Sequence, residues 1–359
     1  MVPARKGLRH VHVVIRVDAS DSVGSGHVMR CLTLAQMARV RGAQVVFISR
    51  EGPGDLCDVI AARGFAVRRL PQRSGADAVG WREDAAECSA ILDAHERTLD
   101  LLVVDHYLLD ARWESALRSY TKRILVLDDL ADRPHECDVL LDQNLHDTAD
   151  DRYGTLVPPG TRVFVGPRFA LLRPEFDSVR PRLRDRGVGR TLVFLGGSDP
   201  TLETLKLVAA FRTLADAAPF TTIVLGKQHA APGAVVEAAS HRQNLKIVTH
   251  TDEMAQLTAE ADLGVGTCGG AAWERCLLGL PALVVVTAEN QRDDARILHS
   301  LGAVCNLGDA QDVSTQTWAG EIRGLMDSPR TLLSMSQAAL RVMQGRPEAT
   351  RAFEAAVFA

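Results

Sequence analysis

A histidine flanked by glycines and charged residues stands near the start of the chain, where it could do acid–base chemistry. The run Gly24-Ser25-Gly26-His27 follows an apolar segment that ends in Arg16-Val17-Asp18, and Arg30 lies almost one helical turn after the histidine. An imidazole has an unperturbed pKa of about 6.5, so a neutral histidine beside a carboxylate can act as a general base. The alternative is a tight strand-to-helix turn with an incidental histidine.

A second glycine turn is better suited to an anion than the first, which lacks the third glycine of G-x-G-x-x-G and the Lys-Ser/Thr of a P-loop. Gly269-Gly270 connects an apolar strand to a helix that we expect to begin near Ala271. Backbone N–H groups beside small residues can approach a diphosphate at such a helix N-terminus. Glu274, about one turn further on, could accept both hydroxyls of a ribose. The alternative is a compact turn with a surface glutamate.

Three further polar clusters follow predicted strands. Asn290 and Gln291 offer donors and acceptors that suit sugar hydroxyls or N-acetyl groups, and Asn290 could also be the N-cap of the next helix. Asp105-His106-Tyr107 and Asp142-Gln143-Asn144 are expected to line the same crevice as the first histidine. For His106, a satisfied structural role is the favoured interpretation.

The elements that must position these residues alternate regularly. Apolar runs of strand length alternate with helix-periodic segments, which predicts an α/β fold with parallel sheets covered by helices on both faces. One helix is expected after Gly26, with a stop at Arg41-Gly42, and the first strand of the second half ends in a similar turn at Gly196-Gly197-Ser198. The predicted strands are 11–17, 44–48, 66–70, 101–105, 124–128, 139–141, 191–195, 221–225, 246–249, 263–266 and 282–286.

Two domains are expected from the length of 359 residues, because a single core stops growing at roughly 250 to 300 residues. The periodicity lapses between Pro158 and Gly189, where proline, glycine and arginine are frequent, and this predicts an interdomain linker. We expect an N-terminal domain over 1–175 that carries the base and a C-terminal domain over 176–359 that binds the nucleotide. Both should be doubly wound and face each other across a cleft.

Composition excludes several classes of function. The 41 basic and 45 acidic side chains give a net charge of -4, which argues against a nucleic-acid partner. The seven cysteines are scattered without a C-x-x-C spacing, so neither a zinc site nor a disulfide framework is expected. Segment 128–138 holds several potential metal ligands, but a proline interrupts it and no pair has helical metal-site spacing. We interpret this segment as a solvated, turn-rich connection and expect no metal.

The chain shows no targeting or membrane signal. The apolar stretch after Arg5, Lys6 and Arg9 is interrupted by charged residues, so it does not predict a signal peptide. Roughly 20 consecutive apolar residues, as a membrane helix needs, occur nowhere. These features predict a cytoplasmic protein without membrane insertion.

Several longer blocks resemble the UDP-2,4-diacetamido-2,4,6-trideoxy-β-L-altropyranose hydrolases of pseudaminic acid biosynthesis, which are relatives of the two-domain GT-B glycosyltransferases. The resemblance extends from about residue 11 to about residue 300. This sequence departs from the family at Ala271 and Ala272, where the family often has serine or threonine. It also has an N-terminal extension of about ten residues. The matching blocks are RVDAS (16–20), GSGHVMRCLTLA (24–35), VDHY (104–107), LDDLADR (127–133), LDQN (141–144), GPRFALLRPEF (166–176), GGSD (196–199), WERC (273–276) and ENQ (289–291).

The resemblance implies a GT-B-like fold and hydrolysis of a UDP-sugar, in which water attacks the anomeric carbon with inversion and UDP leaves. It implies that His27 is the general base, that Glu274 binds the ribose, and that no metal or cofactor takes part. A small-molecule UDP-sugar is the expected partner, and a monomer is compatible with the sequence. The residues expected to bind the sugar are Asp18, Arg30, Tyr107, Asn290 and Gln291, and those expected to bind UDP are Gly197, Ser198, Gly226, Gly269, Gly270 and Glu274.

Two other functions remain open at this point. A GT-B glycosyltransferase would use the same UDP site and pass the sugar to an acceptor. A noncatalytic nucleotide-sugar binding protein would bind the substrate without turnover. An activity measurement without acceptor separates the hydrolase from the transferase.

Overall fold

The computed structural model describes residues 11–20, 23–73, 80–94, 97–147, 152–240, 242–249 and 251–358. The chain divides into two compact units. The first unit comprises Met1–Gln143, Asp150–Val165 and Glu348–Ala359, and the second comprises Asn144–Ala149 and Gly166–Pro347.

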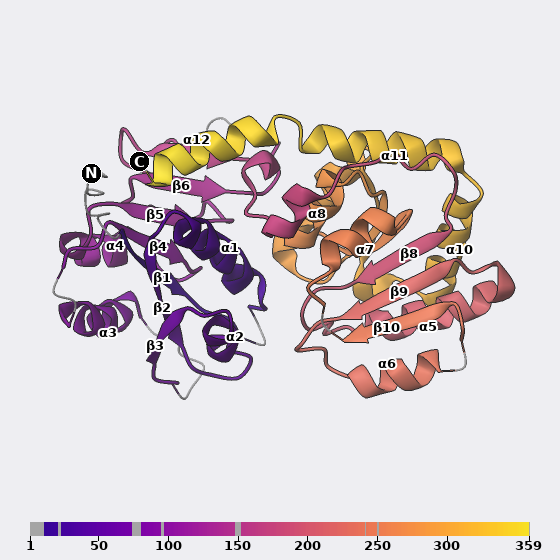
Figure 1. Ribbon diagram of the computed structural model, residues 1–359, viewed down its shortest axis with the longest axis horizontal. Helices are drawn as coiled ribbons and strands as arrows, with labels where there is room; N and C mark the ends of the chain where they lie inside the picture. The colour runs from indigo at the N-terminus through magenta and orange to yellow at the C-terminus, as the bar shows by residue number, and fades with distance from the viewer. Residues whose placement is uncertain are drawn as a thin grey trace, which may run out of the picture. The chain divides into compact units, whose positions relative to one another are not determined.

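Seven parallel strands form the sheet of the first unit, in the order β3-β2-β1-β4-β5-β6-β7. Figure 1 shows them in indigo to magenta. The strands are β1 His12–Val17, β2 Gln44–Arg50, β3 Ala66–Leu70, β4 Leu101–Asp105, β5 Ile124–Leu127, β6 Val139–Asp142 and β7 Arg162–Val165. The helices of this part of the chain are α1 Gly26–Val40, α2 Cys57–Ala62, α3 Trp81–Asp93 and α4 Ala111–Leu117, followed by the short 3-10 turn η1 Arg118–Tyr120.

Six parallel strands form the second sheet, in the order β10-β9-β8-β11-β12-β13. The strands are β8 Arg190–Phe194, β9 Phe220–Leu225, β10 Leu245–Thr249, β11 Leu263–Thr267, β12 Ala282–Val286 and β13 Val304–Asp309. The helices are α5 Glu203–Leu214, α6 Pro232–Ala239, α7 Met254–Glu260, α8 Gly270–Leu277, α9 Arg292–Ser300, α10 Thr315–Met326 and α11 Pro329–Val342, and the 3-10 turns are η3 Pro167–Phe169, η4 Pro174–Ser178, η5 Ala215–Ala217, η6 Glu289–Gln291 and η7 Ala310–Asp312.

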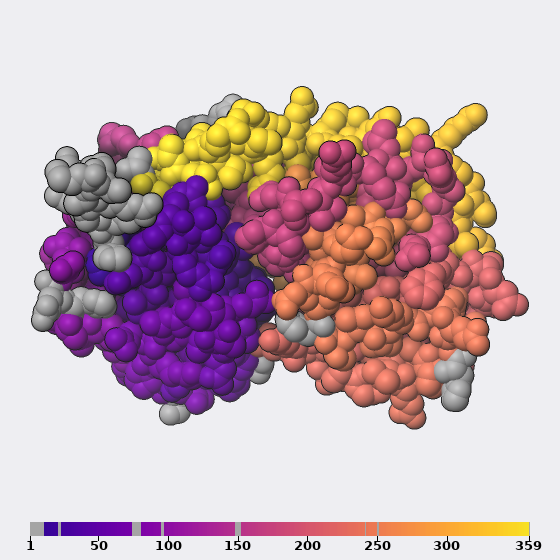
Figure 2. Space-filling model, in the orientation of Figure 1, coloured from indigo at the N-terminus to yellow at the C-terminus, as the bar shows by residue number. Residues whose placement is uncertain are grey.

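The last helix, α12 Arg346–Phe358, returns the chain to the first unit. Arg123 donates to the carbonyl of Ala356 at 3.1 Å, and the ring of Phe353 packs edge-to-face against Phe164. In the space-filling view the yellow atoms of this helix lie against the indigo atoms of the first unit (Figure 2). The division therefore differs from the predicted boundary at 175, because a tertiary contact attaches the end of the chain to its beginning.

The predicted α/β fold with two doubly wound sheets is confirmed, and every predicted strand is present within a residue or two of its expected bounds. Two edge strands were not predicted. β7 falls inside the proline-rich segment that the sequence indicates as a linker, and it pairs with β6. β13 carries polar residues and a glycine with positive φ at Gly308, so its apolar pattern is weak. Edge strands are covered less completely, so their sequences carry less of the buried-strand signal.

Both sheets have the strand order of a dinucleotide-binding fold. In each sheet, all strands are parallel, and the order in which strands are added reverses beside the first strand. In the first sheet β1 lies between β2 and β4, and in the second β8 lies between β9 and β11. Ligands of open parallel sheets bind outside the carboxyl ends of the strands at this reversal. The two turns singled out in the sequence, after β1 and after β11, both lie at such positions. Among the helices of the described residues, none has the length and apolar character needed to span a bilayer.

Candidate functional site

The imidazole of His27 is held by a buried carboxylate in the first unit. His27 lies in the first turn of α1, and Asp105 is the last residue of β4, the strand beside β1. The ring Nδ1 lies 2.5 Å from Oδ1 of Asp105. Because an ionised carboxylate only accepts hydrogen bonds, Nδ1 carries a proton, and in the neutral imidazole Nε2 therefore keeps its lone pair. The geometry thus orients the imidazole as a base.

Arg30 keeps Asp105 ionised. Its Nε and Nη2 donate to the two oxygens of Asp105 at 2.6 Å each, and its Nη1 donates to Asp129 at 2.7 Å. Burial by itself would raise the pKa of Asp105, but the charge of Arg30 and the hydrogen bonds from Arg30 and His27 hold it well below its usual range. A charged partner for the imidazolium is therefore present before any proton is transferred.

Tyr107 completes this cluster. Its ring packs edge-to-face on the imidazole of His27, with 4.5 Å between the ring centroids, and its hydroxyl donates to Asp129 at 3.2 Å. The structure thus brings together His27, Arg30 and Tyr107, as the sequence predicts. Asp105 was expected only as a wall of the crevice, and no role was predicted for Asp129; their position after neighbouring strands β4 and β5 was the available signal.

Asp18 belongs to a different network. Its carboxylate accepts hydrogen bonds from Arg16 at 2.5 and 2.8 Å and from the backbone N–H of Arg50 at 2.7 Å, and it lies 3.2 Å from Nε2 of His106. Burial would raise the pKa of Asp18, but the charge of Arg16 lowers it well below its usual range. The structure thus bonds Arg16 and Asp18 to each other. Contact of Asp18 with a sugar stays a prediction.

The acidic segment 128–138 is more buried than expected. Asp128 and His135 have exposed fractions of 1% and 3%, and Nδ1 of His135 lies 2.7 Å from Glu114. The hydroxyl of Tyr153 lies 3.0 Å from both Asp128 and Asp142. The expectation of a solvated connection is therefore wrong for Asp128 and His135, which are buried and bond to partners elsewhere in the unit, while Asp132 and Pro134 are exposed. Over the part of the chain that the structure describes, no cluster of three or more histidine, cysteine or acidic side chains is arranged to hold a metal ion.

In the second unit, the turn after β8 packs against the end of β9. A Cβ added to Gly226 would lie 2.1 Å from the carbonyl oxygen of Gly197, so only glycine fits this approach. The carbonyl of Ser198 accepts a hydrogen bond from Ala230 at 3.1 Å. The three residues predicted to bind UDP here, Gly197, Ser198 and Gly226, are thus brought together.

The N-terminus of α5, which follows this turn, is capped by the protein itself. Both oxygens of the buried Asp199 accept backbone N–H groups, from Glu203 at 3.0 Å and from Thr204 at 2.9 Å. A carboxylate therefore occupies the position at which a phosphate would bind.

The N-terminus of α8 is open by comparison. Gly269 is its N-cap, and no side chain caps the helix. A Cβ on Gly269 or on Gly270 would meet nothing within 4 Å, so the protein's own packing does not require glycine at either position. A helix N-terminus without a side-chain cap favours an anion.

Glu274 is buried and paired. Nε and Nη2 of Arg173 donate to its two oxygens at 2.8 Å each, and the residue has an exposed fraction of 8%, so it is no surface glutamate. A carboxylate has about four acceptor positions, and this fork occupies two of them. Arg173 was not predicted as a site residue, although it lies in one of the blocks that carry the resemblance.

Asn290 and Gln291 lie in the 3-10 turn η6 after β12. Asn290 is exposed, and the Gln291 side-chain oxygen accepts hydrogen bonds from the N–H and the hydroxyl of Thr287 at 3.2 Å each. Gln291 occupies the N-cap position of α9, and no side-chain hydrogen bond caps that helix. The expected N-cap role of Asn290 is therefore wrong, and sugar binding by either residue stays a prediction.

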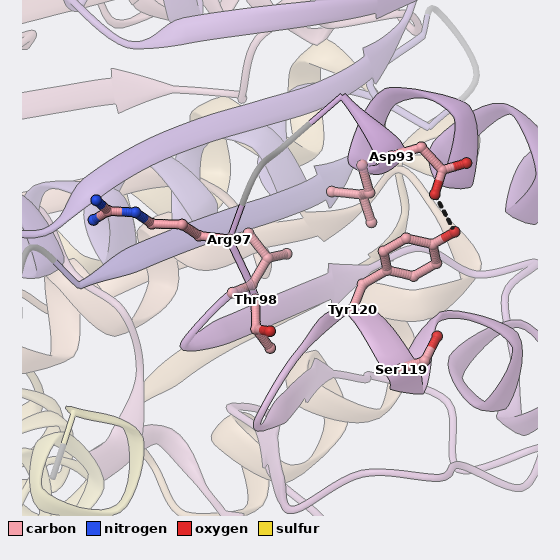
Figure 3. A pocket seen from close by; sticks show the side chains of 7 residues that line it. Asp93, Arg97, Thr98, Ser119 and Tyr120 are labelled. Carbon is pink, nitrogen blue, oxygen red and sulfur yellow. Dashed lines mark hydrogen bonds between the residues drawn. The ribbon is translucent and has the colours of Figure 1, made fainter.

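A cavity of about 260 Å³ lies near the amino ends of the central strands of the first sheet (Figure 3). Leu99 precedes β4 and Tyr120 precedes β5, so the cavity borders the amino ends of these strands, away from His27. The hydroxyl of Tyr120 donates to Asp93 at 2.7 Å within it. It is lined by Leu92, Asp93, Arg97, Thr98, Leu99, Ser119 and Tyr120.

Comparison with known proteins finds a match to a glycosyltransferase domain and similarity to curated proteins. Residues 191–350 match the glycosyltransferase family 28 C-terminal domain. The chain is 26% identical over 294 residues to the UDP-2,4-diacetamido-2,4,6-trideoxy-beta-L-altropyranose hydrolase of Campylobacter jejuni, covering 81% of this chain and 97% of that protein. It is 23% identical over 339 residues to the spore coat polysaccharide biosynthesis protein SpsG of Bacillus subtilis, covering 94% and 95% of the two chains.

Solved structures confirm the GT-B fold. The crystal structure of Acinetobacter baumannii MurG matches with a TM-score of 0.64 at 16% identity, over 97% of this chain and 99% of that one. The structure of LpCGTa in complex with UDP matches with a TM-score of 0.65 at 14% identity, over 98% and 100% of the two chains. The chain is thus related to the GT-B glycosyltransferases and is similar in sequence to a UDP-sugar hydrolase.

Proposed function

We propose that this protein hydrolyses a UDP-linked 2,4-diacetamido-2,4,6-trideoxy sugar, releasing UDP and the free sugar, as a step in pseudaminic acid biosynthesis. The observation that carries the proposal is the pairing of His27 with Asp105, which leaves Nε2 of the imidazole as a base. The similarity to the Campylobacter hydrolase supports the choice of reaction and of substrate class.

In the proposed reaction, a water molecule attacks the anomeric carbon and gives its proton to Nε2 of His27. The bond between that carbon and the diphosphate oxygen breaks, and its electron pair leaves with UDP. Asp105 stabilises the imidazolium that forms, and Arg30 keeps Asp105 ionised. Attack opposite the leaving group inverts the configuration at the anomeric carbon.

The second unit supplies the UDP site in this proposal. The diphosphate binds the open N-terminus of α8 at Gly269 and Gly270, because the N-terminus of α5 is already occupied by Asp199. Arg173 fixes the plane of the Glu274 carboxylate and occupies two of its acceptor positions. The remaining positions of Glu274 accept hydrogen bonds from the two ribose hydroxyls. Gly197, Ser198 and Gly226 form the adjoining wall of the UDP site.

The proposed sugar contacts are Asp18, Arg30, Tyr107, Asn290 and Gln291. Their amide, carboxylate and hydroxyl groups match the hydroxyl and acetamido groups of the substrate.

The decisive experiment follows purified protein and the UDP-diacetamido sugar by NMR, without any acceptor. We expect stoichiometric UDP and free sugar, with the first-formed anomer inverted. UDP-N-acetylglucosamine, which lacks the 4-acetamido group and keeps the 6-hydroxyl, serves as the comparison substrate, and we expect slower turnover with it.

A glycosyltransferase is the second candidate, and the match of residues 191–350 to the family 28 domain favours it. It predicts no UDP release until an acceptor is added. An absolute acceptor requirement would overturn hydrolysis in favour of transfer, and binding without turnover under both conditions would leave a nucleotide-sugar binding protein.

A further inference from the structure

The side chain of Arg275 packs against the glycines of β11, close to the turn between β11 and α8. Gly264 and Gly266 are on the same face of β11, because side chains alternate along a strand. A Cβ on Gly264 would lie 2.8 Å from Cδ of Arg275, and one on Gly266 would lie 3.0 Å from its Nη1. The bare face of the strand thus accommodates the arginine, which has an exposed fraction of 6%.

The buried charge of Arg275 is not compensated by the described part of the protein. Its Nη2 donates to the carbonyl of Thr267 at 2.6 Å, its Nε is buried without a hydrogen-bond partner, and no ion pair with a described residue is formed. Glu274, its neighbour in sequence, is held by both arms of Arg173. Arg173 also forms an ion pair with Glu175 at 3.6 Å, so Glu274 and Glu175 are both paired with Arg173 and not with Arg275.

The neighbouring cysteines do not supply the missing negative charge. Burial raises the pKa of Cys268 and of Cys276 to about 12, so both thiols are neutral near pH 7. Arg184 provides a contrast in the same unit. It is also buried, but its guanidinium donates to the backbone carbonyls of Thr258, Ala261 and Leu278, so its donors are satisfied. A buried charge without a partner destabilises a protein, and such groups are retained chiefly at functional sites.

We propose that Arg275 is the buried cation of the diphosphate site, acting on the ligand through its electric field and not by contact. The guanidinium is anchored at Thr267, two residues before Gly269, so its charge adds to the positive end of α8. The diphosphate supplies the counter-charge that the protein lacks. This inference rests on the proposed function, because it assigns the anion that α8 binds.

Isothermal titration with four probes tests the proposal: UDP, UMP, uridine and inorganic pyrophosphate. In R275M we expect the affinities for UDP and pyrophosphate to fall roughly tenfold to thirtyfold, because one unit charge near the ligand is lost at an effective dielectric constant of about 20. Uridine affinity should stay unchanged, and UMP should show a smaller loss. R275K keeps the charge and should stay within about threefold of wild type.

Arg323→Met is the matched control, because it removes the same charge from an exposed position on α10. It should leave all four affinities unchanged. A purely structural role of Arg275 would instead reduce uridine and UDP binding by the same factor, and that result would overturn the proposal. If R275M does not fold, R275K decides, since a large loss of pyrophosphate affinity with uridine binding kept would contradict a role of charge.

The outcomes also separate this proposal from the proposed function. Wild-type protein that binds pyrophosphate but not UDP would contradict the UDP-sugar activity and leave the anion site standing. Wild-type protein that binds UDP with an affinity insensitive to Arg275 would overturn only the role of the arginine. Binding of neither ligand would overturn both.

Discussion

His27 Nδ1 and Asp105 Oδ1 lie 2.5 Å apart although 78 residues separate them in the chain. The contact joins the first turn of α1 to the end of β4, across the point at which the first sheet reverses its strand order. It selects one tautomer of the imidazole and supplies a negative charge for the protonated form. The predictions for the first unit follow from this pair.

Replacing His27 with asparagine should abolish turnover while UDP binding is kept. General acid–base groups contribute about a hundredfold to ten-thousandfold in rate, and the second unit holds the proposed nucleotide contacts. Single-turnover UDP release and UDP titration measure the two effects separately. Unchanged turnover in H27N would refute the assignment of the base.

Asp105→Asn should reduce kcat by a similar factor with little change in UDP affinity. The amide can donate to Nδ1, which favours the tautomer whose Nε2 carries the proton and cannot act as a base. Asp129→Asn is the control, since Asp129 accepts hydrogen bonds from Arg30 and Tyr107. An equal loss in both variants would show that the network as a whole matters, and not the tautomer.

Arg173→Met should reduce the preference for UDP over 2′-deoxy-UDP. The bidentate pair fixes the plane of the Glu274 carboxylate, so a free carboxylate would rotate and hold the ribose hydroxyls less well. Glu274→Ala should weaken UDP binding by about tenfold or more and remove the preference. Competitive titration of the two nucleotides gives the ratio, and a preference unchanged in both variants would exclude a ribose contact.

Gly226→Ala should destabilise the second unit, because its Cβ would lie 2.1 Å from the carbonyl oxygen of Gly197. Overpacking of this kind costs about 1–3 kcal/mol of the free energy of unfolding. Gly233→Ala in α6 is the matched control, since its Cβ meets nothing within 4 Å, and it should stabilise the protein by up to about 1 kcal/mol. Urea unfolding of both variants measures the difference, and equal stabilities would contradict the close approach.

Protonation of Asp84 at low pH should lower the free energy of unfolding. Burial opposes the ionised form, but the charge and hydrogen bonds of Arg16 lower the pKa of Asp84 to about 2, compared with about 3.9 in an unfolded chain. The ionised carboxylate therefore stabilises the fold above about pH 4, by about 2 kcal/mol, and this contribution is lost as the pH falls toward about 2. Urea unfolding at pH 5 and pH 2.5 should show a smaller loss for Asp84→Asn than for wild type or for the exposed Asp216→Asn. Parallel losses in all three proteins would contradict this.

The sequence indicated most of the candidate site but not its internal bonding. His27, Glu274 and Gly269-Gly270 were identified because a strand, a glycine turn and a helix follow one another locally. Asp18 was grouped with His27 for the same local reason, and the structure bonds it to Arg16 and to the backbone of Arg50 instead. The alternation of side chains along a strand determines which face of the sheet a residue is on. Residues of other strands determine its hydrogen-bond partners.

The sequence by itself determined the α/β class and the order of most strands and helices, because hydrophobic periodicity and glycine turns act over neighbouring residues. Only the tertiary structure decided that Asp105 holds His27, that Arg173 holds Glu274, and that α12 returns to the first unit. Each of these depends on which strands lie side by side in a sheet or on a contact between distant segments. Ion pairs and close packing form between residues that are distant in sequence, and no local pattern encodes such a distance.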